Sequence, residues 1–277
     1  MSAGSAPVRL PAVAGTFYPA HPGHLRTAVE RFLVRTVDPV SPAAVMVPHA
    51  GYVYSGSTAG KTFAASNLPQ TLIILCPNHT GLGARLAYTA SGSWRTPLGD
   101  VPVDERLARA MAEAFPALED DPIAHQREHA IEVQLPFLQV LLGDFTFVPI
   151  VVGTRALGEL EGLGRAMAGA VSESVEPVAM VVSSDMNHYE DVQTTRDKDS
   201  AALDAVLHVD PARLYREVHE RRISMCGSAP AVAALFACRG LGADKADLVD
   251  YTHSGAVTGD DAQVVSYAGV RVFKGPA

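Results

Sequence analysis

The stretch LIILCPNHTG, residues 72–81, decides how this chain folds, because an apolar run ends abruptly in polar residues and a glycine. Together with Thr71, its first half predicts a buried strand. Pro77 has no N–H to donate and so ends the strand ladder, and Gly81 permits a sharp turn. The stretch therefore predicts a rigid strand that presents His79 in the loop at its carboxyl end.

Strand-like and helix-like patterns alternate along the whole chain. Further strands are expected at 43–47, 145–153, 178–184 and 263–273, and helices at 24–37, 56–66, 103–115, 128–142 and 156–174. Pro136 is expected to kink the helix at 128–142, and two more helices precede CGSAPAVAALFACRG, where Pro230 fits a first helical turn. The pattern predicts one α/β domain over residues 1–277, with a central mixed, largely parallel sheet and helices on both faces.

Composition narrows the class of protein. Of 277 residues, 48% are hydrophobic and 19% charged, which suits a sizeable core, and the net charge of −8 argues against nucleic acid or an anionic membrane as partner. The N-terminus lacks an apolar signal region, and no segment approaches the run of about 18 apolar residues that spans a bilayer. Three cysteines, an odd number, do not suggest a disulfide framework. We therefore expect a cytoplasmic protein.

Three of the expected strands lead into polar residues of the same kind. His49 follows the strand at 43–47, His79 follows 72–75, and Asp185 and His188 follow 178–182. In open α/β sheets, ligands bind beyond the carboxyl ends of the strands, so these side chains are predicted to share one site. Neutral imidazole is the commonest metal ligand in proteins, and histidines from separate strand ends can form part of a metal shell.

An anionic group would complete such a shell, and the residues themselves leave two candidates open, Asp185 and Cys226. Cys226 lies at or just before a predicted helix start, where the helix N-terminus is expected to lower the pKa of the thiol. The thiolate is the form that binds metal. Cys76 and Cys238 lie in apolar stretches, and we expect both to pack in the core.

The segment HQREHAIE contains two histidines at helical spacing, His125 and His129. The zincin pattern requires glutamate directly after the first histidine, and this chain has Gln126 there, so that pattern is rejected. His129 and Glu132 are three residues apart. Either they share a helix face beside the site, in a supporting role, or they belong to an ordinary exposed helix start.

The motifs resemble those of the Memo family, whose bacterial members are called AmmeMemoRadiSam system protein B. The matching segments run in family order and cover nearly the whole chain. They are AGTFYP (14–19), VPHAGYVYSG (47–56), CPNHTG (76–81), REHAIEVQLPFL (127–138), VPIVVG (148–153), VVSSDMNHY (181–189) and MCGSAP (225–230).

The resemblance implies a fold similar to that of the LigB-like class III extradiol dioxygenases, which hold non-haem Fe(II) with two histidines and a carboxylate. Carried over by motif, the Memo metal ligands fall on His49, His79 and Cys226, and Asp185 and His188 match the polar pair beside the metal. Fe(2+) is the metal that this resemblance implies. Because a thiolate in place of a carboxylate makes the site softer, copper or zinc is also compatible with it.

The first functional hypothesis is a metal-dependent oxidoreductase of the extradiol dioxygenase type, with a small oxygen-bearing, catechol-like substrate. His188 would act as general base and Asp185 would orient it. Tyr18, Tyr52 and Tyr54 either donate hydrogen bonds to bound oxygen or simply pack beside the site.

Two other hypotheses stay open. In a hydrolase, Cys226 would be the nucleophile, with His188 as its base and Asp185 as orienting group. Alternatively, the protein is not an enzyme but binds peptides or proteins in the same cleft. The bacterial family name links it to a radical S-adenosylmethionine protein, which is then an expected partner.

Overall fold

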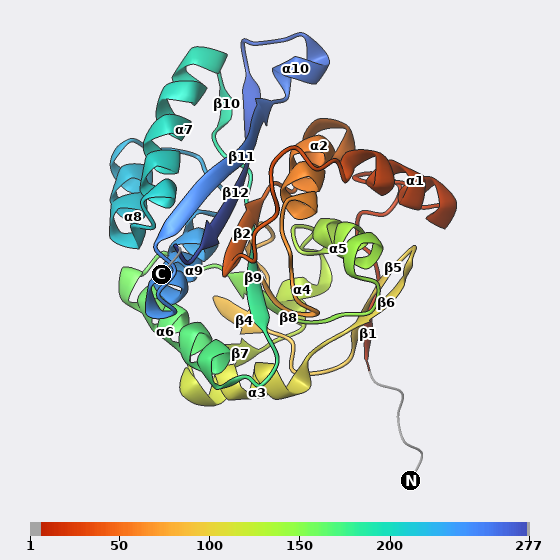
Figure 1. The fold of residues 1–277 in the computed structure, drawn as a ribbon, viewed down its shortest axis with the longest axis vertical. Helices are drawn as coiled ribbons and strands as arrows, with labels where there is room; N and C mark the ends of the chain where they lie inside the picture. The colour runs from red at the N-terminus through yellow and green to blue at the C-terminus, as the bar shows by residue number, and fades with distance from the viewer. Residues whose placement is uncertain (1–6, 276–277) are drawn as a thin grey trace.

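Four parallel strands form the centre of the structure, a computed structural model that describes residues 7–275 (Figure 1). They lie side by side in the order β2 (Ala44–Val47), β9 (Val178–Ser183), β3 (Thr71–Pro77) and β8 (Thr146–Val152). Nearly all of their residues are buried. Because both faces of the sheet are covered, these strands read as continuous apolar runs rather than as alternating ones.

Shorter or more exposed strands extend this sheet on both sides. Its order is β10-β12-β2-β9-β3-β8-β4-β7, and β11 pairs with β12 outside this path. The added strands are β4 (Leu86–Tyr88), β7 (Glu119–Asp120), β10 (His188–Glu190), β11 (Lys245–His253) and β12 (Val264–Phe273). β12 runs antiparallel to β2, and β4 antiparallel to β8, so the sheet is mixed with a parallel centre, as predicted. A separate small sheet consists of β1 (Val8–Arg9), β5 (Ser93–Thr96) and β6 (Gly99–Pro102).

Helices cover both faces of the central sheet, which confirms the predicted fold class (Figure 1). One face carries α1 (Pro22–Phe32), α2 (Tyr52–Ala64) and α5 (Leu135–Leu142). The other carries α3 (Glu105–Ala114), α6 (Leu157–Glu173), α7 (Val192–Leu207), α8 (Pro211–Glu220) and α9 (Ser228–Gly240). The short helices are α4 (Ile123–Gln126), η1 (Glu132–Gln134) and α10 (Gly255–Thr258).

Successive residues of β3 alternate between the two cores. Ile73 and Leu75 pack with the helices of the α6 and α9 side, whereas Leu72, Ile74 and Cys76 pack with those of the α2 and α5 side. Cys238 is also fully buried, in the core that contains α9. Both cysteines that the sequence assigned to packing are therefore core residues. Of the predicted domain, residues 1–6 and 276–277 lie outside the described residues.

The single kinked helix predicted for residues 128–142 is wrong. Residues 128–131 are irregular, η1 follows, and α5 begins afresh with Pro136 in its first turn. Proline is favoured there because its missing N–H has no intrahelical partner in any case. His129 therefore lies in a loop and does not share a helix face with Glu132.

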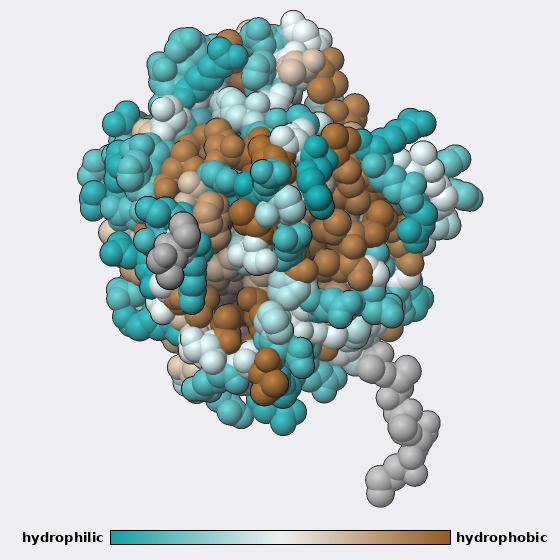
Figure 2. All heavy atoms as spheres, viewed as in Figure 1, coloured by the Kyte–Doolittle hydropathy of each residue, from teal (hydrophilic) through white to brown (hydrophobic). Residues whose placement is uncertain are grey.

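On the face seen in Figure 2, hydrophilic residues surround hydrophobic residues that are visible over α2 and α5. In the described part of the chain, no helix combines the length and the apolar character needed to cross a membrane.

The contact between α6 and α9 yields a matched pair of substitutions. A Cβ on Gly164 would lie 2.5 Å from the Cβ of Phe236 and 2.7 Å from the carbonyl oxygen of Ala233, both on α9, whereas a Cβ on Gly169 of the same helix meets nothing within 4 Å. Gly164→Ala should therefore lower the free energy of unfolding by about 1–3 kcal/mol through overpacking. Gly169→Ala should raise it by about 0.5–1 kcal/mol, because alanine loses less backbone entropy on folding. Urea denaturation measures both, and equal effects would contradict the close approach of α6 and α9.

Candidate metal centre

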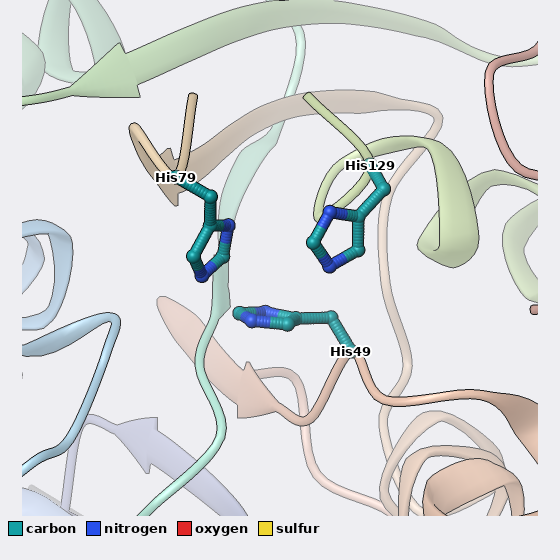
Figure 3. A group of neighbouring side chains, drawn as sticks. All are labelled: His49, His79 and His129. Atoms are coloured by element: carbon teal, nitrogen blue, oxygen red, sulfur yellow. The ribbon is translucent and has the colours of Figure 1, made fainter. Parts of the chain in front are cut away.

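Three histidines from separate loops meet beyond the carboxyl ends of the central strands. His49 follows β2, His79 follows β3, and His129 precedes η1. Their candidate ligand atoms all lie within 4.8 Å of one another, and their ring centroids are 4.9 to 5.5 Å apart. Figure 3 shows the three rings converging on a common point. The predicted meeting of His49 and His79 at one site is therefore present, with His129 as a third member.

The ring of His49 is the most deeply buried of the three, with 2% of the residue exposed. Its Nδ1 lies 2.9 Å from the hydroxyl of Ser183 at the end of β9, and its Nε2 lies 3.2 Å from the Sγ of Cys226. Its main-chain N–H donates to the Asp185 carboxylate at 2.7 Å. The ring is therefore held between β9 on one side and the thiol on the other.

A buried carboxylate, that of Glu128, stands behind the other two histidines. It accepts hydrogen bonds from the main-chain N–H of His79 at 2.7 Å and from that of Ala130 at 3.0 Å, and it lies 2.9 Å from Nδ1 of His79. Nδ1 of His129 is 3.5 Å away. Burial alone would raise the pKa of Glu128, but the hydrogen bonds from His79 and Ala130 outweigh it and lower that pKa.

Glu128 had no place in the sequence prediction, because nothing local distinguishes a glutamate that the fold will bury. The one available signal was its position directly before His129 in REHAIE, a segment that the motif comparison had already singled out. A carboxylate that accepts the second N–H of a ligating histidine is a common support in metal sites.

The electrostatics of the cluster favour neutral imidazoles at His49 and His129. Burial lowers the pKa of His49 well below its usual value, and the neighbouring rings of His79 and His129 lower it further. Burial also lowers the pKa of His129. Neutral rings carry the lone pairs that bind metal, so this donor set fits a transition-metal ion such as iron, copper or zinc.

Cys226 lies where the sequence predicted, directly before Gly227, the N-cap of α9. Its expected low pKa is wrong, because burial raises the pKa of the thiol and the nearby charge of Asp185 raises it further. The imidazole next to its Sγ is that of His49, at 3.2 Å. In the described part of the chain no hydrogen bond joins Cys226 to His188, so the nucleophile and base that a hydrolase requires are not paired.

Asp185 contacts the His49 loop, whereas the main-chain N–H of His188 donates to the hydroxyl of Ser224, and within residues 7–275 no hydrogen bond joins the side chains of Asp185 and His188. The Asp185 carboxylate accepts the main-chain N–H groups of His49 and Ala50, at 2.7 and 3.3 Å, and burial raises its pKa to about 6. It therefore braces the His49 loop and does not orient His188, in contrast to the prediction. Among the described residues, Nδ1 of His188 is buried without a hydrogen-bond partner.

Two of the three candidate tyrosines use their hydroxyls inside the protein. Tyr18 donates to Glu132 at 2.6 Å, and Tyr52 donates to the carbonyl oxygen of Val133 at 2.7 Å. Tyr54 lies on α2 and is partly exposed. The pattern favours packing over hydrogen bonding to a ligand for Tyr18 and Tyr52.

Glu132 is fully buried and ties the N-terminal segment to the domain. Besides Tyr18, it binds the guanidinium of Arg9 and accepts the main-chain N–H groups of Ala12 and Val13, at 2.7 and 3.0 Å. Its role is therefore structural. His125 packs edge-on against Trp94, with ring centroids 5.5 Å apart, and is not part of the histidine cluster.

Pocket size does not locate the centre. A surface depression of about 930 Å³ lies at the amino ends of β3 and β8, beside Thr71 and Thr146, on the opposite edge of the sheet from His79. Its lining mixes charged, amide and apolar groups without a converging donor set. The donor chemistry and the strand-end location identify the histidine cluster instead.

The comparison with a crystal structure of an uncharacterized protein from Escherichia coli K12 extends to the fold alone. The TM-score is 0.54 at 14% identity, and the match covers 81% of this chain and 98% of that chain.

Sequence relatives match almost end to end. A MEMO1 family protein of Methanopyrus kandleri is 39% identical over 281 residues, which cover 96% of this chain and 99% of the relative. A MEMO1 family protein of Archaeoglobus fulgidus is 40% identical over 267 residues, which cover 96% of this chain and all of the relative. The family model described as Memo-like protein matches residues 9–271. The resemblance seen in the motifs is confirmed, and the chain belongs to the Memo family.

Proposed function

We propose that this Memo protein binds one Fe(2+) ion at the histidine cluster and acts as a non-haem iron oxidoreductase of the extradiol dioxygenase type. Its substrate would be a small oxygen-bearing, catechol-like molecule. The observation that carries the proposal is the convergence of three imidazoles from separate loops on one point, with the Glu128 carboxylate behind two of them.

His49 and His79 are the proposed protein ligands, and either Cys226 or His129 supplies the third. Cys226 Sγ lies 3.2 Å from Nε2 of His49, whereas His129 belongs to the group of ligand atoms within 4.8 Å of one another. The two choices differ in metal preference, because a thiolate favours softer ions such as copper(I) or zinc, whereas three imidazoles suit iron as well as zinc and copper.

A bound metal ion would supply Lewis-acid activation of a chelating substrate and a binding position for dioxygen. The chain itself supplies the orientation of the proposed ligands. Glu128 and Ser183 hold the rings of His79 and His49, and Asp185 fixes the His49 loop. The side chains of His79 and His129 are 32% and 20% exposed, so the centre opens to solvent on their side.

His188 is the proposed general base for a substrate hydroxyl. Its ring is mostly buried, and burial lowers its pKa, which keeps the imidazole neutral and able to accept a proton. Its Nδ1 is buried without a hydrogen-bond partner among the described residues.

Metal content is the first test of the proposal. His49→Ala and His79→Ala should each abolish stoichiometric metal in protein purified without chelators, as measured by elemental analysis, because each removes a ligand from a small shell. Cys226→Ser and His129→Ala identify the third ligand, since only the true ligand's loss should reduce the metal content.

The exposed His24 of α1 provides a control, and His24→Ala should leave the metal content unchanged. A wild-type protein that purifies without metal and takes up none from Fe(2+), Cu(+) or Zn(2+) solutions would overturn the proposed function.

The carboxylate behind the cluster yields a second prediction. Glu128→Gln keeps the size of the side chain but removes the charge that accepts from His79. Metal affinity should fall by about 10–100-fold, as for other groups that orient ligands in metal sites. Competition with a coloured chelator measures the affinity, and unchanged binding would show that Glu128 serves folding alone.

Catalysis is tested by oxygen uptake. Iron-loaded protein should consume oxygen with at least one member of a panel of catechols, and His188→Gln should lower kcat/KM by about 10²–10⁴-fold while it keeps its iron, because a general base contributes about that much. An iron-loaded wild type that is inert across the panel, yet co-purifies with a radical S-adenosylmethionine protein, would instead support the non-enzymatic binding function.

A further inference from the structure

A buried hydrogen-bond chain stands behind His49, on the side of the ring away from Cys226. At its centre is the hydroxyl of Ser183, a fully buried residue at the end of β9. Its Oγ lies 2.9 Å from Nδ1 of His49, 2.9 Å from Nε2 of Gln134 and 2.7 Å from the carbonyl oxygen of Ala130. Nε2 of Gln134 also lies 2.9 Å from the carbonyl oxygen of Pro48.

The two carbonyl groups determine the direction of every hydrogen bond in this chain. The carbonyl of Pro48 can only accept, so the amide of Gln134 must turn its NH₂ group towards it, and the same NH₂ donates to Ser183. The carbonyl of Ala130 also can only accept, and it takes the one proton of the Ser183 hydroxyl. The hydroxyl oxygen of Ser183 can then only accept a hydrogen bond from His49.

It follows that Nδ1 of His49 carries the proton. A neutral imidazole has a single N–H, so its Nε2 holds the lone pair on the side of Cys226. We propose that Ser183, held in one orientation by Gln134 and by the Ala130 carbonyl, is a positioning residue that fixes His49 in the Nδ1-protonated tautomer and directs its Nε2 lone pair into the metal centre.

The arrangement at His79 supports this assignment independently. Nδ1 of His79 lies 2.9 Å from the Glu128 carboxylate, which as an anion can only accept, so this ring also donates from Nδ1, and the lone pair of its neutral form is on Nε2. A hydroxyl and a carboxylate, on different elements, thus impose the same tautomer on two histidines of the cluster. A purely structural role would not require that agreement.

The amide of Gln134 is retained at an energetic cost. Among the described residues its Oε1 is buried without a hydrogen-bond partner, and leaving a buried acceptor unsatisfied is unfavourable because the group has lost its bonds to water. An apolar side chain in its place would avoid that cost but would leave Ser183 without its donor. The unsatisfied amide oxygen of Gln134 is explained if its NH₂ group is needed to orient the Ser183 hydroxyl beside His49.

The tautomer can be measured directly in wild-type, metal-free protein. In two-bond ¹H–¹⁵N correlation spectra of ¹⁵N-labelled protein at neutral pH, Nδ1 of His49 should show the chemical shift of a protonated nitrogen. A bare Nδ1 would overturn the proposal. This measurement needs no variant and no metal, so it stands apart from the proposed function, on which only the role at the metal rests.

Ser183→Ala tests the consequence. Without the hydroxyl, both tautomers of His49 should become populated, and the affinity for Co(2+), followed by its visible absorption, should fall by about 10–100-fold. Ser66→Ala provides a matched control, because Ser66 is also buried but only donates to the carbonyl of Thr62 in α2; it should change neither quantity.

A Ser183→Ala variant with wild-type tautomer and affinity would overturn the proposal. If wild type fails to bind Co(2+) while Nδ1 is protonated, the metal-binding function falls and the tautomer assignment stands.

Discussion

The buried carboxylate of Glu128 is the group on which the rest of the centre depends. A carboxylate without solvent exposure is costly unless hydrogen bonds compensate it, and here the loop after β3 provides two through His79 while Ala130 adds a third. These bonds join the loop after β3 to the segment before η1. The hydrogen bonds that compensate the charge of Glu128 therefore also set the positions of His79 and His129. The same interactions stabilise the fold and arrange the site.

The sequence predicted the centre of the fold because the four parallel strands are continuous apolar runs, and that signal is local. It missed β4, β7 and β10 because strands of two or three residues form only through pairing with neighbours. β11 was missed for a different reason. Its nine residues are partly exposed along their length and include Lys245, Asp247 and Asp250, so neither a buried run nor a clear alternation marks it.

For the site, strand ends were sufficient to find His49 and His79, the position of Cys226 near a helix start made it one of two candidates for the third ligand, and the family motifs selected it over Asp185. Glu128 and Ser183 could not be found in this way, because their importance comes from burial and from partners distant in sequence. The predicted low pKa of Cys226 is wrong because the effect of the helix N-terminus is smaller than the effect of desolvation. A helix N-terminus stabilises a negative charge by about 0.3–1 kcal/mol, whereas desolvation can shift a pKa by several units, each worth about 1.4 kcal/mol. Desolvation therefore dominates at Cys226.

The buried polar groups around the three histidines are compatible with a bound cation. Glu128 and Asp185 are buried carboxyl groups beside the histidine cluster, burial lowers the pKa of His49, and burial has raised the pKa of Asp185 to about 6. Among the described residues, the hydrogen bonds that compensate these two carboxyl groups come mainly from main-chain N–H groups and not from lysine or arginine side chains. A divalent ion at the convergence of the rings would interact favourably with all of these groups at once. Because the hydrogen bonds behind the rings already fix their orientation, binding the ion would require little further ordering of the chain.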